Sequence, residues 1–116
     1  MRYLAMIYSD EATDPTAGSS AQTEMSEGYR VFGEEAGRRG ALLGGERLRP
    51  CAEAKTVRIR DGKTLVSDGP FAEAREQLGG YYVLNCGSEA EAIELAALIP
   101  GAKNGSIEVR PIWEME

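Results

Sequence analysis

The amino-acid sequence predicts an α+β domain of the ferredoxin-like type, with elements in the order β-α-β-β-α-β and an additional β-hairpin. Two segments, residues 2–8 and 80–85, are apolar on both alternating faces, which is typical of central strands covered on both sides. Two further segments carry apolar residues at helical spacing. The first and third strands of this topology form the central pair of an antiparallel sheet, and they are the two doubly apolar segments. A length of 116 residues corresponds to one domain, residues 1–116.

The first half of the chain supplies a strand, a loop and a helix. In residues 2–8, Leu4 and Met6 alternate with Tyr3, Ala5 and Ile7, and residues 9–21 form a loop rich in small polar residues. A helix is predicted from residue 23 to between residues 37 and 40, with the apolar stripe Met25, Tyr29, Phe32 and Ala36. Gly28, Gly33 and Gly37 interrupt this helix at about 1 kcal/mol each relative to alanine, so they indicate either close packing, a ligand groove or imperfect helix propensity.

The second half supplies the remaining strands and the second helix. Residues 41–48 predict a strand with a kink or bulge at Gly44-Gly45, and residues 56–60 and 64–66 predict a hairpin around Asp61-Gly62. After the strand at 80–85, Ser88 and Glu91 form a capping box, and the helix that they open stops at Pro100-Gly101. The final strand, residues 107–112, belongs at an edge because Pro111 has no backbone N–H.

Composition narrows the class of protein. Thirteen basic and nineteen acidic residues give a net charge of −6, which disfavours nucleic acid and anionic lipid as partners. With 42% hydrophobic and 28% charged residues, the chain is expected to be soluble. The first apolar segment is too short to span a membrane and has no cleavage pattern behind it, so we expect a cytoplasmic protein.

The chain has no histidine and two cysteines, Cys51 and Cys86. Without histidine, Ser-His and Cys-His triads and ordinary zinc or non-haem iron sites are excluded. The cysteines match no metal-binding spacing and are expected to be free thiols. We therefore expect neither a metal nor a cofactor, and acid-base chemistry would fall to carboxylates, tyrosines or lysines with shifted pKa values.

Two helices can cover only one face of the sheet. The other face, with apolar residues drawn from Tyr3, Ile7, Tyr81 and Val83, needs another cover. A homodimer that packs sheet against sheet is the simplest solution. The alternative is that the extra hairpin folds back over its own sheet.

The segment Asp68-Gly69-Pro70-Phe71, followed by Ala72 to Gly80, places two tight-turn signals around a charged stretch. These thirteen residues resemble the core of the YCII-related, or DGPF-domain, proteins. Residues 1–11 resemble the opening strand and acidic loop of that family, and residues 105–111 resemble its closing strand. The resemblance implies a dimeric α/β-barrel-like assembly. One departure is Arg75, which stands where relatives usually carry lysine.

The resemblance implies two different kinds of activity, one enzymatic and one regulatory. Some members of the wider group are considered enzymes because they pair a histidine with an aspartate, and one relative eliminates chloride from a hydroxylated aromatic ring. That dyad cannot be carried over, because this chain has no histidine. Relatives of the Asp-Gly-Pro-Phe branch are also often encoded beside sigma factors of the extracytoplasmic type.

Two hypotheses follow. The first is a small-molecule-binding dimer or a small cofactor-independent enzyme, with a pocket between sheet and helix or at the dimer interface. Asp68 would be a catalytic base or donor-orienting group and Arg75 a clamp for an anionic ligand. The remaining predicted pocket residues are Tyr8, the Gly79-Gly80 backbone, and Tyr81 or Tyr82 as a polar tip in an apolar wall. The ligand would be a small organic anion or a polar aromatic compound.

Structural roles are the alternative for the same two charged residues. Asp68 would cap the turn, and Arg75 would pair with Glu73 or Glu76. The second hypothesis is a non-catalytic regulatory partner protein linked to sigma-factor-dependent transcription. Its acidic surface, for instance Glu34-Glu35 and the group Glu89, Glu91 and Glu94, would meet a basic partner.

Overall fold

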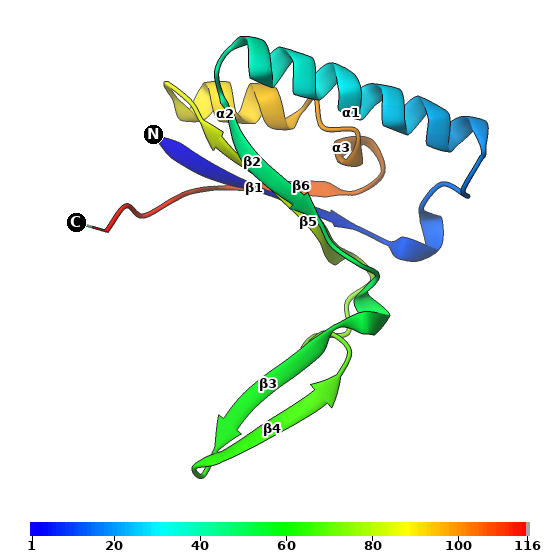
Figure 1. Cartoon of the computed structure of the whole chain (residues 1–116), viewed down its shortest axis with the longest axis vertical. Coiled ribbons are helices and arrows are strands. Elements are labelled where there is room, and N and C mark those ends of the chain that lie inside the picture. The colour runs from blue at the N-terminus through cyan, green and yellow to red at the C-terminus, as the bar shows by residue number, and fades with distance from the viewer. Residues whose placement is uncertain (116) are drawn as a thin grey trace.

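The computed structural model of the protein describes residues 1–115. Its main sheet has four antiparallel strands in the order β2-β5-β1-β6, with bounds β1 Arg2–Ser9, β2 Leu42–Arg47, β5 Gln77–Asn85 and β6 Ser106–Pro111 (Figure 1). The two doubly apolar segments are the central pair, and the strand that ends at Pro111 lies at an edge, as predicted. The arrangement is compatible with a ferredoxin-like fold.

Three helices lie against one face of this sheet: α1 Ser20–Arg38, α2 Glu89–Ala96 and the short α3 Gly101–Asn104 (Figure 1). Two single 3₁₀ turns, Glu11–Thr13 and Cys51–Glu53, stand in the connections. The first helix begins three residues before its predicted start because the Ser19 hydroxyl accepts a hydrogen bond from the backbone N–H of Gln22 at 3.1 Å. No helix among the described residues is long and apolar enough to cross a membrane.

The hydrophobic core fills the space between the helices and the sheet. Phe32 of α1 packs on Tyr82 of β5, with ring centroids 4.7 Å apart. The fully or nearly fully buried residues are Tyr3, Ala5, Phe32, Ala36, Ala41, Leu84, Cys86, Ala92, Leu95, Ala96 and Ile99. The helical stripe of α1 and the apolar positions of α2 therefore face the sheet, as their spacing predicts.

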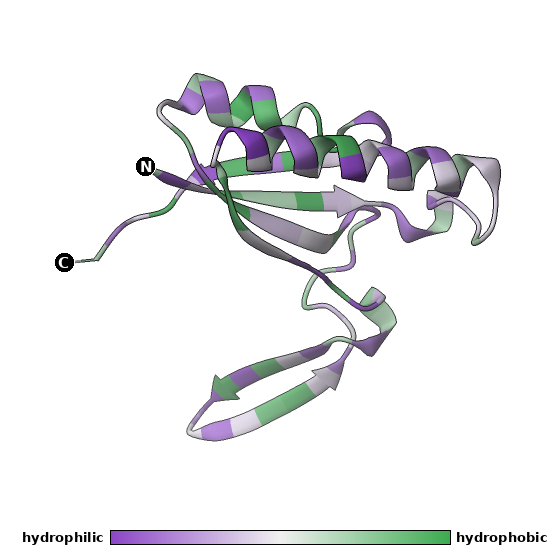
Figure 2. Cartoon of the chain, turned by 45° about the horizontal axis from the view of Figure 1, so that its top comes forward, coloured by the Kyte–Doolittle hydropathy of each residue, from purple (hydrophilic) through white to green (hydrophobic). Residues whose placement is uncertain are grey.

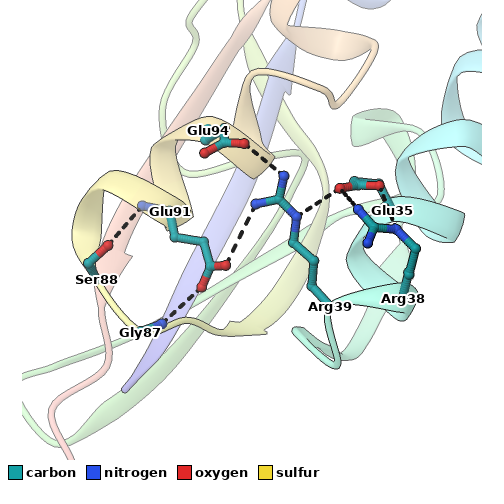
Figure 3. Close-up of polar contacts among 7 residues, drawn as sticks. All are labelled: Glu35, Arg38, Arg39, Gly87, Ser88, Glu91 and Glu94. Carbon is teal, nitrogen blue, oxygen red and sulfur yellow. Dashed lines mark hydrogen bonds and ion pairs between the residues drawn. The ribbon is translucent and has the colours of Figure 1, made fainter.

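A polar cluster joins the end of α1 to α2 (Figure 3). Arg39, which directly follows α1, donates to Glu35 Oε1 at 2.8 Å and to Glu94 Oε1 at 2.7 Å, and its Nη1 lies 3.6 Å from Glu91 Oε2. Ser88 caps α2 as predicted, because its Oγ accepts from the backbone N–H of Glu91, whereas the Glu91 carboxylate accepts from the N–H of Gly87 and not from that of Ser88. The guanidinium of Arg39 thus ties the two helices together.

The second face of the sheet carries no helix. Leu4 lies opposite Val83 and Met6 opposite Tyr81 in the register of the two central strands, and all four side chains are only partly buried. We call these four residues the open face. Tyr3 and Ile7 lie on the helix side, so of the four residues predicted for the uncovered face, only Tyr81 and Val83 belong to it.

The extra hairpin forms a separate two-stranded sheet, β3 Lys55–Arg60 and β4 Lys63–Asp68, which we call the arm. Its tip at Asp61-Gly62 has φ values of 52° and 74°, as the predicted hairpin turn requires. The arm extends away from the body, on the side of the sheet opposite the helices (Figures 1 and 2). The alternative in which the hairpin folds back over its own sheet is therefore wrong. In agreement, the radius of gyration is 16.1 Å, whereas a compact chain of this length has about 13 Å.

The Asp68-Gly69-Pro70-Phe71 segment closes the base of the arm. Gly69 has φ of 87°, a conformation that glycine adopts at no steric cost. Its N–H donates to the carbonyl of Ala54 at 2.7 Å, and its carbonyl accepts from Thr56 Oγ1 at 2.8 Å. Asp68 pairs with Lys55 across the two strands. In the single chain, the motif holds the arm and returns the chain to β5.

Candidate ligand-binding site

A cavity of about 780 Å³ lies between α1 and the helix side of the sheet, next to the core. It is formed where α1 begins, where β2 ends and where β5 starts, and its rim comes from the loop after β1 and the segment after β2. The lining residues are Ile7, Ser9, Glu11, Asp14, Pro15, Gln22, Met25, Ser26, Tyr29, Gly45, Glu46, Arg47, Leu48, Pro50, Gln77, Gly79, Gly80, Tyr81, Tyr82, Gly101 and Asn104. The volume is in the range of small-molecule sites.

Tyr29, Tyr82 and Arg47 are among the polar residues that line this cavity. Burial raises the pKa of Tyr29, and the nearby Arg47 guanidinium and the backbone amide of Gly101 oppose this shift. Burial likewise raises the pKa of Tyr82, with a smaller contribution from Tyr29. Both phenols therefore stay protonated at neutral pH, where they can donate hydrogen bonds.

Arg47 is the cation of the site. It lies opposite Gly80 in the register of β2 and β5, so its side chain is on the helix side of the sheet. Within residues 1–115, Arg47 makes no ion pair, whereas Arg49 two positions later pairs with Glu53. An unpaired guanidinium beside a half-buried phenol is a suitable anchor for an anionic group.

The backbone of strands β2 and β5 forms the floor of the cavity. A Cβ atom on Gly80 would lie 2.9 Å from the carbonyl oxygen of Glu46, and one on Gly45 would lie 2.5 Å from that of Tyr81. Neither position has room for a side chain unless the strands separate. The Gly79-Gly80 backbone thus lines the cavity.

The rim is held by Glu11. Its carboxylate accepts from the backbone N–H of Cys51 at 2.7 Å and lies 3.3 Å from Cys51 Sγ. The hydrogen bond to Glu11 is the main cause that raises the pKa of the Cys51 thiol, so this cysteine is a poor nucleophile at neutral pH. Asp14, also on the rim, accepts from Ser9 Oγ at 3.4 Å.

The predicted site residues fall into two groups. Gly79, Gly80 and Tyr82 line the cavity, and Tyr81 contributes to its lining although it belongs to the open face. Tyr8 lies on the side of the open face, where its hydroxyl is 3.9 Å from Met6 Sδ.

Asp68 and Arg75 also lie outside this cavity. The Asp68 side chain is 85% exposed at the base of the arm, and Arg75 is exposed in the following loop. The proposed pairing of Arg75 with Glu73 or Glu76 is absent from the described residues. A ligand-binding role for Tyr8, Asp68 and Arg75 stays a prediction that concerns a different surface.

Sequence reasoning missed Tyr29, Met25 and Arg47 as cavity residues. Tyr29 and Met25 have the spacing of the core stripe, and only their place near the start of α1, beyond the packed core, exposes them to the cavity. For Arg47 the reason is the bulge between Leu42 and Gly44, which shifts the alternation by one residue and turns Arg47 to the helix side. The Gly44-Gly45 pair is the signal that could have indicated this shift.

Within the described residues, no three His, Cys, Asp or Glu side chains lie close enough together to hold a metal ion. The lining offers tyrosine hydroxyl groups, one guanidinium, carboxylates, serine hydroxyl groups, side-chain amides and exposed peptide groups.

Comparison with known proteins identifies the family. The family model of the YCII-related domain matches residues 1–116. An uncharacterized protein of Rhizobium meliloti (strain 1021) is 39% identical over 119 residues, and the match covers 97% of this chain and 92% of that protein. The chain therefore belongs to the YCII-related family.

Proposed function

We propose that this YCII-related protein binds a small organic anion or a polar aromatic compound in the cavity between α1 and the sheet. The observation that carries the proposal is the unpaired Arg47 beside the half-buried Tyr29 in a cavity of about 780 Å³. An apolar surface combined with charged and hydrogen-bonding groups that can orient a ligand is typical of small-molecule sites.

The lining favours one negative charge on the ligand. Arg47 can accept a carboxylate in a bidentate arrangement, and the Tyr29 hydroxyl can donate to the same group or to a ring substituent. Met25 and Ile7 offer apolar contact for a ring or chain. Glu11 and Asp14 on the rim would repel a ligand with several negative charges, such as a nucleotide.

Binding is favoured over catalysis by the state of the two phenols. Their raised pKa values make them hydrogen-bond donors and poor general bases. Cys51 is held in its thiol form by Glu11 and cannot readily act as a nucleophile. We therefore propose a binding protein, and a cofactor-independent reaction would need a base supplied by the rim carboxylates.

The test is a titration of the ¹⁵N-labelled protein with small aromatic and aliphatic carboxylic acids, beginning with 4-hydroxybenzoate. We expect chemical-shift changes at the amides of Met25, Gly79 and Gly80. Arg47→Gln should raise the dissociation constant about tenfold to a hundredfold, because one charged hydrogen-bonding partner contributes about 1.5–3 kcal/mol to binding.

The matched control is Arg49→Gln, which removes an equal charge two positions along the chain and outside the cavity lining. It should leave the affinity unchanged. Equal losses in the two variants, or shift changes confined to the open face and the arm, would count against a site in the cavity.

We also propose that the protein forms a homodimer through the open face. Leu4, Met6, Tyr81 and Val83 form a continuous apolar strip on the central strands and have no helix above them. A second copy can cover this strip through the same surface on both partners, as two-fold symmetry requires.

The acidic surface gives less support to a regulatory partner. Glu35, Glu91 and Glu94 are the carboxylates around Arg39, and Glu34 lies 3.0 Å from Arg30. Four of the five glutamates predicted to meet a basic partner therefore already take part in ion pairs within the chain. This favours ligand binding over a partner-binding role linked to transcription.

A further inference from the structure

We propose that the arm of each copy packs against the second copy, with its apolar face formed by Val57, Ile59 and Val66. The two arms would then embrace the dimer from opposite sides. This inference rests on the proposed dimer through the open face and adds a second contact surface to it.

The arm has an apolar face with nothing against it in the single chain. Val57 lies opposite Val66 in the strand register, and Ile59 is on the same face as Val57 two residues further along. These side chains are 62%, 62% and 66% exposed for Val57, Val66 and Ile59, respectively. An isolated two-stranded hairpin is marginally stable in water at best, so the arm needs a surface to pack on.

The position of the arm indicates which molecule covers its apolar face. The arm extends from the edge of the sheet on the side opposite the helices, which is the side of the open face (Figures 1 and 2). A second copy seated on the open face would be flanked by the arm. A single second copy of the chain would thus bury both the open face and the apolar face of the arm.

Charge supports a second copy of this chain as that partner. The arm carries four basic residues against two acidic ones, Asp61 and Asp68, while the whole chain has a net charge of −6. Within residues 1–115, the arm residues Arg58, Arg60 and Lys63 make no ion pair. The remainder of the molecule is strongly acidic, so a basic arm and an acidic body attract each other between copies.

Acidic residues also flank the open face, although one of them, Glu108, lies 3.4 Å from Arg110 of its own strand. Glu46 on β2 lies opposite Tyr81, and Glu108 on β6 lies opposite Met6, so both belong to the side of the open face. They occupy the two outer strands, one on each flank of the apolar strip. This pattern of an apolar centre with charged edges is typical of protein interfaces.

The first test shortens the arm. Residues 57–66 are replaced by Asp-Gly, so that Thr56 and Ser67, a cross-strand pair of the same type as Arg60 and Lys63, flank the same turn. The ion pair of Lys55 with Asp68 and the bonds of Gly69 are kept. Sedimentation equilibrium of the wild-type chain should give twice 12.5 kDa at micromolar concentration. The short-arm variant should show a dimer dissociation constant raised about tenfold or more.

A second set of variants keeps the arm at full length. Val57→Thr, Ile59→Thr and Val66→Thr in one protein retain β-branched side chains and hence the strand propensity, but they make the apolar face polar. This triple variant should also raise the dissociation constant. The matched control is Leu65→Thr, which makes the same kind of change on the opposite face of the arm and should leave the dissociation constant unchanged.

A measurement on the unaltered chain completes the test. In a mixture of ¹³C-labelled and unlabelled copies, filtered nuclear Overhauser spectra should show contacts from the methyl groups of Val57, Ile59 and Val66 to the unlabelled copy. This measurement tests the proposal even if the short-arm protein fails to fold.

The outcomes separate the two proposals. A wild-type chain of 12.5 kDa at micromolar concentration overturns the dimer and the arm contact together. A wild-type dimer whose dissociation constant is the same in the short-arm and triple variants, with no methyl contacts between copies, overturns the arm contact alone.

Discussion

At the scale of single residues, the three glycines of α1 differ in what surrounds them. A Cβ atom on Gly28 would lie 2.7 Å from Cγ of Pro100, while one on Gly33 or Gly37 would meet no atom within 4 Å. Close packing therefore explains Gly28, and the other two are simply weak helix formers. The sequence allowed both explanations because helical spacing alone does not show which turn meets the loop before α3.

This difference predicts opposite effects of one substitution. Gly33→Ala should raise the free energy of unfolding by up to about 1 kcal/mol through helix propensity. Gly28→Ala should lower it by about 1–2 kcal/mol, because the rigid Pro100 ring cannot move aside and overpacking outweighs the propensity gain. Urea denaturation of both variants checks the prediction, and equal stabilisation by the two changes would contradict it.

At the scale of elements, Arg39 couples α1 to α2 (Figure 3). The hydrogen bonds from Arg38 and then Arg39 lower the pKa of Glu35. A carboxylate whose pKa is lowered in the folded state stabilises the fold at pH values above its ordinary range. That contribution is lost as the pH falls through the lowered pKa.

Arg39→Gln should therefore lower the melting temperature by a few degrees at pH 7 and low ionic strength. The difference from the wild-type chain should shrink as the pH falls through the lowered pKa of Glu35, because below it Glu35 is protonated in either protein. Arg30→Gln is the control, because Arg30 pairs only with Glu27 and Glu34 of its own helix. A difference that grows toward acid pH would exclude this role for the cluster.

Helices, strands and turns were predictable where a single local sequence signal determined their type or position. The doubly apolar strands, the helix cap at Ser88, the Asp61-Gly62 turn and the edge position of Pro111 are all present. The direction of the arm was not predictable, because nothing in a hairpin sequence says whether its apolar face meets its own sheet. The faces of β2 were not predictable either, since a bulge of one residue reverses them.

At the scale of the whole molecule, stability comes from one core between the sheet and its helices. Cys51 and Cys86 are free, and Cys86 is buried in that core. The melting temperature should therefore be the same with and without a reductant such as dithiothreitol. Calorimetry in both buffers checks this, and a fall of more than a few degrees on reduction would reveal a disulfide that holds the molecule together.

The candidate site marks the limit of sequence reasoning. Gly79, Gly80 and Tyr82 were predicted because they lie in a central strand that follows the Asp68 to Phe71 turn. Tyr29 and Arg47 could not, because a cavity exists only where α1 extends past the packed core and where the end of β2 faces it. Asp68 and Arg75 were predicted as site residues because of their sequence motif. Within one chain, this motif forms the base of the arm.

The glycine floor of the cavity has a consequence for how this site can diverge. Gly45 and Gly80 leave no space for larger residues, so a side chain at either position would force the strands apart. Gln22, Met25 and Ser26 come from the first turns of α1 and line the opposite wall without belonging to the buried core. Substitutions there can change which ligand fits while the fold is retained. One scaffold could in this way serve many ligands during evolution, and a library randomised at these three positions would explore the same range in the laboratory.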